Sequence, residues 1–193
     1  MPVRMVVGLG NPGPRYRRTR HNVGFMVASE LLDRAGCGAQ RMQDEALVAP
    51  IRIGEADLLV VQPQTFMNLS GVSVAAAARR RGVEPSEILM VYDDADLPVG
   101  AVRVRAAGSP AGHRGVMSIT QVLGTREIPR IRLGIGKDAG ELAERVLAPF
   151  TKAELPIVEQ MIQDAADAVE VVILQGITAA MNAYNRRAVP AGE

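Results

Sequence analysis

The chain begins with an apolar run, followed by a loop and an amphipathic stretch. Apart from Arg4, residues 3–9 are apolar or glycine and rich in valine, which predicts a strand. The glycine- and proline-rich run 10–14 marks the loop that ends it. Beyond Asn22, apolar side chains recur mostly at helical spacing until Gly36 supplies a stop signal. The pattern therefore predicts a strand, a long loop and a helix.

Two further apolar runs lie close together after this helix. Residues 46–53 and 57–62 have β-like composition, and the three residues between them suit the turn of a hairpin. A stretch of small residues then extends from Leu69 to Gly82, a glycine of the kind that ends helices. The hairpin predicts an antiparallel strand pair, and the stretch after it a second helix.

The middle of the chain contains a continuously apolar run. Residues 88–92 resemble strands that are buried on both faces of a sheet, and the acidic residues of 93–96 follow at the carboxyl end. Alternation at 102–105 predicts a strand with one solvent-exposed basic face. The glycine- and proline-containing run 107–112 predicts a flexible loop after that strand.

The last third of the chain is mainly helical. We expect short helices near 116–123 and 141–147, with a strand at 130–136 between them. Thr151 and Glu154 have capping-box spacing and predict the start of a long amphipathic helix. Because helices alternate with strands while the hairpin is antiparallel, the expected fold is a single α/β domain. Its central twisted mixed sheet should carry helices on both faces.

Composition agrees with one globular domain. A chain of 193 residues with 48% hydrophobic content can bury one substantial core. No apolar run approaches the roughly 20 residues that span a bilayer, and the first apolar stretch is too short for a signal peptide. We therefore expect no membrane association and a cytoplasmic location. The single cysteine, Cys37, excludes an internal disulfide and has no cysteine neighbour at metal-ligand spacing.

Charge is balanced in total but uneven along the chain. The formal net charge is +1, yet arginines cluster at 15–20, 79–81 and 103–105. Such local patches can outweigh a neutral total. Aromatic residues make up only 3% of the chain, which disfavours extensive base stacking. A nucleic-acid partner would therefore be held mainly by its phosphates.

The first loop raises one rival function. Residues 8–13 match the literal glycine fingerprint of dinucleotide-binding folds, directly after a predicted strand. In that fold the helix begins at the third glycine, whereas here the loop 14–20 intervenes. The acidic residue for the ribose should end the second strand, yet Glu30 and Asp33 fall inside the predicted helix. The context therefore argues against a dinucleotide cofactor.

His21 lies where the arginine-rich loop meets the first predicted helix. Taken alone, it could be only a polar residue at a helix start. A histidine base needs an acceptor for its second ring nitrogen, which fixes the tautomer and stabilises the imidazolium. Asp93 can fill that role, because open α/β sheets build their sites near the carboxyl ends of strands. The two residues together form a candidate base and its orienting partner.

The acidic run offers an alternative. Asp93, Asp94 and Asp96 could bind Mg²⁺, since hard cations prefer carboxylate oxygens. No further histidine, cysteine or glutamate cluster accompanies them. For Asp94 and Asp96 we favour a plain acidic turn, and we expect no metal.

Two asparagines are also candidates. Asn68 stands at a predicted helix start and offers both a carbonyl acceptor and an NH₂ donor. It could instead be only an N-cap, a position that asparagine fills well. Asn11 could likewise be only a turn former ahead of Pro12. Each asparagine is ambiguous when taken singly.

Taken together, these motifs resemble those of the bacterial peptidyl-tRNA hydrolases. The resemblance follows the order of the chain, covers essentially its whole length and is far more specific than the glycine pattern alone. The matching segments are residues 8–13 with Tyr16, then 19–22, 65–71, 93–98, 112–115 and 132–136.

The resemblance implies a monomeric esterase that needs no metal or cofactor. It would hydrolyse the ester bond of peptidyl-tRNA and recycle the tRNA, with His21 as the base and Asp93 as its orienting partner. The substrate-binding positions that it implies are Asn11, Tyr16, Met67, Asn68, His113 and Arg114. The tRNA, contacted at its acceptor stem and 3′ end, would be held through its phosphates by Arg103, Arg105 and Arg132.

One loop departs from the family pattern. The family often has asparagine where this chain has Arg114, and further glycines where it has 109–111. Arginine can donate to a carbonyl or pair with a phosphate but cannot accept a hydrogen bond, so we interpret Arg114 as gripping the substrate. We expect a mobile loop near 106–117, stiffened by Pro110, and a helical C-terminal region near 139–185.

The main rival is a non-catalytic RNA-binding relative with the same fold. Such a protein would hold RNA within a larger assembly and would not need the polar residues of a hydrolytic site. The presence of Asn11, His21, Asn68 and Asp93 argues against it.

Overall fold

The computed structural model describes residues 2–137 and 141–186, and one sheet of seven strands lies at the centre of this part. The inner strands pair in parallel, β1 with β4 and β5, and β5 with β7. The outer pairs are antiparallel. In spatial order the strands are β2 (Arg41–Gln43), β3 (Ala46–Ile53), β4 (Ala56–Pro63), β1 (Met5–Gly8), β5 (Ile88–Asp94), β7 (Arg130–Gly134) and β6 (Val102–Arg105).

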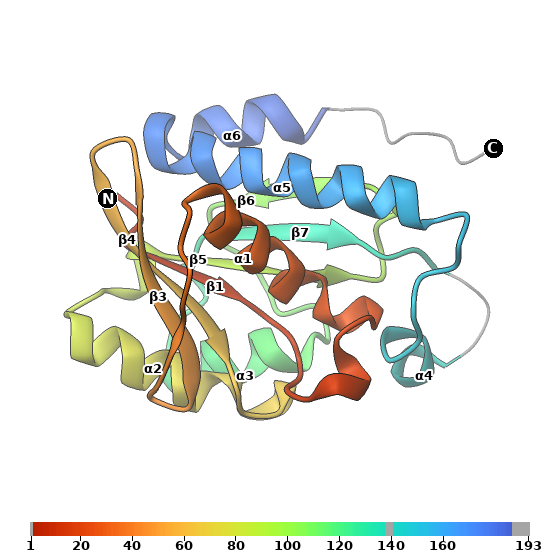
Figure 1. Cartoon of the computed structure of the whole chain (residues 1–193), viewed down its shortest axis with the longest axis horizontal. Helices are drawn as coiled ribbons and strands as arrows, with labels where there is room; N and C mark the ends of the chain where they lie inside the picture. Colours follow the sequence, from red (N-terminus) through yellow and green to blue (C-terminus); the bar gives the residue numbers. More distant parts are fainter. Residues whose placement is uncertain (1, 138–140, 187–193) are drawn as a thin grey trace.

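Helices cover both faces of the sheet (Figure 1). One layer contains α1 (Val23–Arg34), α5 (Leu155–Gln175) and α6 (Ile177–Tyr184), and the other contains α2 (Ser70–Arg81) and α3 (Arg114–Leu123). The short α4 (Leu142–Val146) stands beyond the carboxyl ends of the central strands (Figure 1). The 3₁₀ turns are η1 (Pro14–Tyr16), η2 (Arg20–Asn22), η3 (Met67–Leu69) and η4 (Pro85–Glu87). The expected mixed α/β sheet between helices is confirmed.

Alternation along the strands divides the core in two. In β1, Val6 packs into the core under α1 and α5, whereas Met5 and Val7 pack into the core against α2. Successive side chains of a strand point to opposite faces, so an inner strand with both faces covered must be apolar throughout. This explains the continuous apolar run that ends in β5.

The chain leaves β1 toward one face of the sheet and leaves β4 toward the other. The loop after β1 leads to α1, whereas the loop after β4 leads to α2 on the opposite face. At such a switch point the two loops diverge and open a crevice outside the carboxyl ends of the strands. The fold therefore places a cleft at this edge of the sheet.

The glycines of the first loop serve packing. A side chain on Gly8 would place its Cβ 2.3 Å from the Gly24 carbonyl oxygen, and one on Gly10 would overlap the Phe25 ring. Gly13 is followed by η1 and not by a helix that could receive a pyrophosphate. The dinucleotide-like spacing thus results from the close approach of α1 to β1.

Several details differ from the sequence pattern. The short strand β2 is not predicted by it, and Asp93 and Asp94 belong to the end of β5. Thr151 and Glu154 form the capping-box hydrogen bonds, but α5 begins only after Glu154. The last helical region is broken at Gly176, where φ is +90°. Within the described residues, every helix is too short or too polar to cross a membrane.

Candidate active site

A cleft of about 510 Å³ lies at the carboxyl edge of the sheet. The loops after β1, β4 and β5 form its floor, and the start of α3 and one side of α4 form its walls. The residues that line it include every catalytic and substrate-binding position that the sequence predicted: Asn11, Tyr16, His21, Met67, Asn68, Asp93, His113 and Arg114. The structure thus brings together residues from distant parts of the chain.

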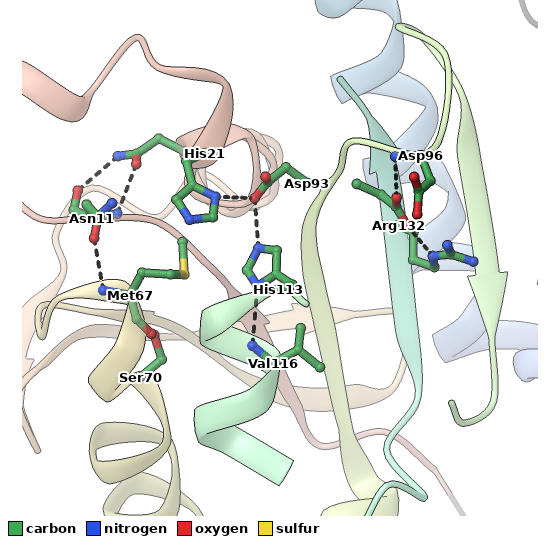
Figure 2. A network of polar contacts seen from close by, with 11 residues as sticks. Asn11, His21, Met67, Ser70, Asp93, Asp96, His113, Val116 and Arg132 are labelled. Carbon is green, nitrogen blue, oxygen red and sulfur yellow. Dashed lines mark hydrogen bonds and ion pairs between the residues drawn. The ribbon is translucent and has the colours of Figure 1, made fainter. Parts of the chain in front are cut away.

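His21 and Asp93 form a direct pair. The Nδ1 atom of His21 lies 2.8 Å from Oδ1 of Asp93, and both side chains are almost fully buried (Figure 2). An ionised carboxylate can only accept, so His21 donates from Nδ1. Its Nε2 has no hydrogen-bond partner among the described residues and is the nitrogen that can meet a ligand in the cleft. The pairing expected from the sequence is present.

A second histidine shares the same carboxylate oxygen. Nε2 of His113 lies 2.9 Å from Oδ1 of Asp93, so this nitrogen donates as well. The other ring nitrogen, Nδ1, accepts the backbone N–H of Val116 at 3.3 Å, which fixes the tautomer (Figure 2). His113 is also the N-cap of α3 and packs edge-on against Tyr92. The sequence pointed to His113 as a substrate contact but gave no sign of this shared acceptor.

The electrostatics of Asp93 follow from these contacts. Burial alone would raise the pKa of Asp93, but His113 and His21, as hydrogen-bond donors and as cations when protonated, hold it well below its usual range. The carboxylate therefore stays ionised at neutral pH. A buried anion with two imidazole donors is suited to stabilise a proton that arrives on either ring.

In the described part of the chain, these three residues also form the one group of histidine, cysteine or acidic side chains that lie close enough together to hold a metal ion. Their ligand atoms lie within 4.8 Å of one another. Both histidine nitrogens in this group are already within hydrogen-bond distance of the same oxygen, so a cation would have to displace both donors. The arrangement fits proton transfer better than coordination.

Asn11 is held by two partners. Its backbone exchanges two hydrogen bonds with the side chain of Asn22, each 2.9 Å long. Its side-chain Oδ1 accepts the N–H of Met67 at 2.9 Å (Figure 2). With the oxygen engaged, the NH₂ group is the part of the amide that can donate to a ligand. Asn11 is therefore more than a turn former, and Asn22 is a supporting residue whose role the sequence did not indicate.

Asn68 and Tyr16 line the cleft in less constrained positions. Asn68 is exposed and lies within η3, while the N-caps of η3 and α2 are Phe66 and Leu69. The alternative prediction of a helix cap for Asn68 is therefore wrong, and its amide is available to a ligand. Tyr16 ends η1 and carries the Arg15 guanidinium 4.5 Å above its ring.

Permanent charges occupy the rim of the cleft. Nε of Arg132 donates to Asp94 at 2.5 Å, and the other oxygen of Asp94 accepts the N–H of Asp96 (Figure 2). Asp96 in turn pairs with Lys137 at 2.8 Å. The acidic run is therefore a turn with ion pairs. Its three carboxylates have different partners and do not converge as Mg²⁺ ligands would.

The predicted phosphate-binding arginines share one sheet face. Arg103 of β6 stands directly opposite Arg132 of β7, and Arg105 follows two positions along β6. Arg103 donates to the carbonyls of Val102 and Tyr184, and Arg105 remains exposed. The sequence indicated a basic strand face, and the antiparallel register places Arg132 on it.

Arg114 is exposed at the start of α3 and lines the cleft beside Pro110 and Ala111. No ion pair or hydrogen bond links its guanidinium to any residue within 2–137 and 141–186. Ala111 has a φ of +47°, a left-handed conformation that L-residues adopt at some cost.

The opposite wall of the cleft is formed by apolar side chains of the α4 segment, Leu142, Val146 and Leu147. The sequence did not predict this wall, because a few apolar residues in a short helix carry no signal that distinguishes a cleft wall from core packing.

Known proteins share both the sequence and this architecture. The sequence profile described as peptidyl-tRNA hydrolase matches residues 5–191. The peptidyl-tRNA hydrolase of Syntrophomonas wolfei is 47% identical over 183 residues, which are 95% of this chain and 100% of the relative. That of Chloroflexus aggregans is 45% identical, over 94% of this chain and 98% of the relative. The crystal structure of the Acinetobacter baumannii enzyme matches with a TM-score of 0.90 and 29% identity, over 95% of each chain.

Proposed function

The chain belongs to the peptidyl-tRNA hydrolase family, and we propose that it hydrolyses the ester bond of peptidyl-tRNA with His21 as the general base. One observation carries this assignment. His21 donates from Nδ1 to a buried carboxylate, so its second nitrogen is left as a proton acceptor in the cleft. The net reaction consumes water and releases a peptide carboxylic acid and a tRNA with a free 3′-terminal hydroxyl.

In the first step, Nε2 of His21 removes a proton from water as the water oxygen attacks the ester carbonyl. The carbonyl π pair moves to oxygen, which produces a tetrahedral oxyanion, and His21 becomes an imidazolium. Asp93 stabilises that cation through the 2.8 Å hydrogen bond. In the second step the oxyanion re-forms the carbonyl, the bond between the acyl carbon and the ribose oxygen breaks, and His21 gives its proton to that leaving oxygen.

Side-chain amides would stabilise the developing charge and orient the peptide. The NH₂ group of Asn11 faces the cleft because its oxygen is held by Met67, and Asn68 adds an exposed amide nearby. Preorganised donors of this kind stabilise an oxyanion more than a flexible donor does. Polar contacts to the first peptide bond would favour peptidyl over aminoacyl esters, because a substrate lacking that bond leaves buried groups unpaired. Tyr16, Met67 and His113 would complete the substrate-binding surface.

The tRNA would be held by charge. Arg103, Arg105 and Arg132 lie on one face of the sheet, and Arg132 contacts Asp94, which lines the cleft. There they would meet phosphates of the acceptor stem and 3′ end. Arginine suits this role because its planar guanidinium can bind phosphate through two hydrogen bonds. The protein would act as a monomer in the cytoplasm, where translation supplies its substrate.

The loop near 106–117 would adjust to the substrate. Its base is tied down, since the buried Arg130 donates to the carbonyls of Ser109 and Arg126. Its far end carries His113, which holds Asp93, and Arg114, which reaches the cleft. We therefore expect motion mainly between Pro110 and Gly112, with Arg114 gripping the substrate.

A direct assay tests the function. Purified protein is incubated with N-blocked aminoacyl-tRNA and, separately, with the unblocked aminoacyl-tRNA, without added metal or cofactor. We expect release of the blocked amino acid and much slower release of the free one. A protein that binds tRNA but releases neither would be the non-catalytic relative, and the proposed function would be rejected.

A further inference from the structure

Three consecutive side chains of η2 are buried and point to three different partners. Asn22 holds the backbone of Asn11, and His21 donates to Asp93. Arg20, only 4% exposed, reaches behind them to Glu154 just before α5, 134 positions away in sequence. The turn that carries the proposed base is thus fixed at three points, and only the first two belong to the cleft.

The contacts of Arg20 are specific. Two of its guanidinium nitrogens meet the two oxygens of Glu154 at 2.8 Å each, which is the bidentate geometry that only arginine provides. One of these nitrogens also donates to the carbonyl of Ile135 at 3.0 Å, and the group lies 4.8 Å above the Phe150 ring. Burial alone would raise the pKa of the Glu154 carboxyl, but Arg20 and the N–H of Thr151 hold it below its ordinary value.

The same connection reaches the opposite wall of the cleft. The backbone N–H of Arg20 donates to the carbonyl of Ala148, and Thr19 forms a β-bridge with Pro149. The preceding segment contains α4, whose residues Leu142 and Val146 line the cleft across from the base. The segment anchored by this partly buried ion pair therefore contacts both the base and a wall that the substrate would contact.

Local structure alone would not hold η2 in place. It is a single 3₁₀ turn, and Thr19 at its N-cap makes no side-chain capping hydrogen bond. Short 3₁₀ turns have poor hydrogen-bond geometry. A buried ion pair often adds little to stability compared with apolar packing, but it imposes one geometry. The pair is therefore better suited to orientation than to stability.

We propose that Arg20 and Glu154 are positioning residues that set the direction of the His21 imidazole and its distance from the α4 wall. This inference rests on the proposed role of His21. Neither residue lines the cleft, so both would act through η2. A small displacement of a catalytic group can cost on the order of 100-fold in rate, which sets the scale of the expected effect.

The test is Glu154→Gln, which keeps the shape of the side chain but offers Arg20 only one acceptor oxygen. We expect kcat to fall by about 10- to 100-fold while KM changes by less than about twofold. In the NMR spectrum, the proton shared by His21 and Asp93 should shift or broaden. Asp57→Asn is the matched control, because Arg52 and Asp57 form an equally bidentate but exposed pair on the β3–β4 hairpin. Its kcat should equal that of the wild type.

A purely structural role predicts a different result. If Glu154→Gln lowers the melting temperature but leaves kcat per folded molecule unchanged, the proposal is wrong. Should that variant not fold, Arg20→Met with Glu154→Leu removes both charges and leaves none unpaired. Wild-type kcat in that folded double variant would also overturn the proposal. His21→Ala in the same assay separates the two hypotheses, since retained activity there refutes the base itself.

Discussion

Two neighbouring carboxylates at the end of β5 have opposite kinds of partner. Asp93 accepts from two imidazoles, His21 and His113, whose charge depends on protonation. Asp94 pairs with Arg132, a permanent cation. Adjacent strand residues face opposite sides of a sheet, so the consecutive residues Asp93 and Asp94 lie in different environments.

The difference separates two tasks. A carboxylate bound to neutral imidazoles gains interaction energy when a proton arrives, which is what a catalytic step requires. A carboxylate bound to arginine is already neutralised, and its partner can exchange it for another anion such as a phosphate. The proposed roles therefore divide into catalysis at the Asp93 cluster and tRNA binding at the Asp94 rim.

The largest effect is expected at the base. His21→Ala should lower kcat by about 10²- to 10⁴-fold, the usual contribution of a positioned general base. Binding of tRNA should stay within about twofold of the wild type, because the basic rim is intact. Single-turnover kinetics and filter binding measure the two quantities. Unchanged hydrolysis would remove His21 from the mechanism.

Asp93→Asn should reduce kcat by about 10²-fold, since the amide orients the imidazole poorly and cannot stabilise its cation. The same variant also tests how the stability of the fold depends on pH. The pKa of Asp93 is lower in the folded chain than in the unfolded one, so its stabilisation is complete above about pH 4 and is lost as pH falls further. Urea melts across this range should be less pH-dependent for the variant. A variant with the full acid dependence would show that other carboxylates govern it.

Arg132→Ala should act on binding alone. We expect KM to rise about tenfold, or about 1.4 kcal/mol, with kcat nearly unchanged. The slope of log affinity against log salt should fall by about one, as for the loss of one phosphate contact. Asp94→Asn is the opposing control, because it frees Arg132 and should lower KM. A fall in kcat with unchanged KM would place Arg132 in the catalytic cluster and contradict the proposed separation of catalysis from tRNA binding.

The smallest effect is expected at Arg114. Its exposed guanidinium can form at most a solvent-screened contact, so Arg114→Asn should raise KM about two- to fivefold. Steady-state kinetics at two salt concentrations would detect it, since the effect should shrink at high salt. An unchanged Michaelis constant would mean that Arg114 does not grip the substrate.

Periodicity predicted most of the fold. The apolar run of β5, the hairpin of β3 and β4, and the amphipathic helices follow from local patterns. Burial on one face leaves a repeat of two or 3.6 residues, and burial on both faces leaves a continuous apolar run. The break at Gly176 and the delayed start of α5 were missed. The start of α5 involves a tertiary contact, because the capping-box carboxylate of Glu154 also binds Arg20.

The site was predictable as a set of residues but not as a network. The sequence brought His21 to Asp93 because both follow strands at the same sheet edge. It could not show that His113 shares the carboxylate, since this depends on a loop that includes Ala111 at positive φ. Nor could it pair Arg132 with Asp94, because the local pattern of neither strand shows that β5 and β7 are neighbours in the sheet.

The close approach of Gly8 and Gly24 limits how this enzyme can diverge. A side chain at Gly24 would place its Cβ 2.3 Å from the Val91 carbonyl oxygen, two residues before Asp93. Any larger residue would push the start of α1, and His21 with it, away from β5. Substitutions are therefore not tolerated at these glycines, whereas exposed rim positions such as Arg114 can change. New substrate preferences can arise at the rim without disturbing the position of His21.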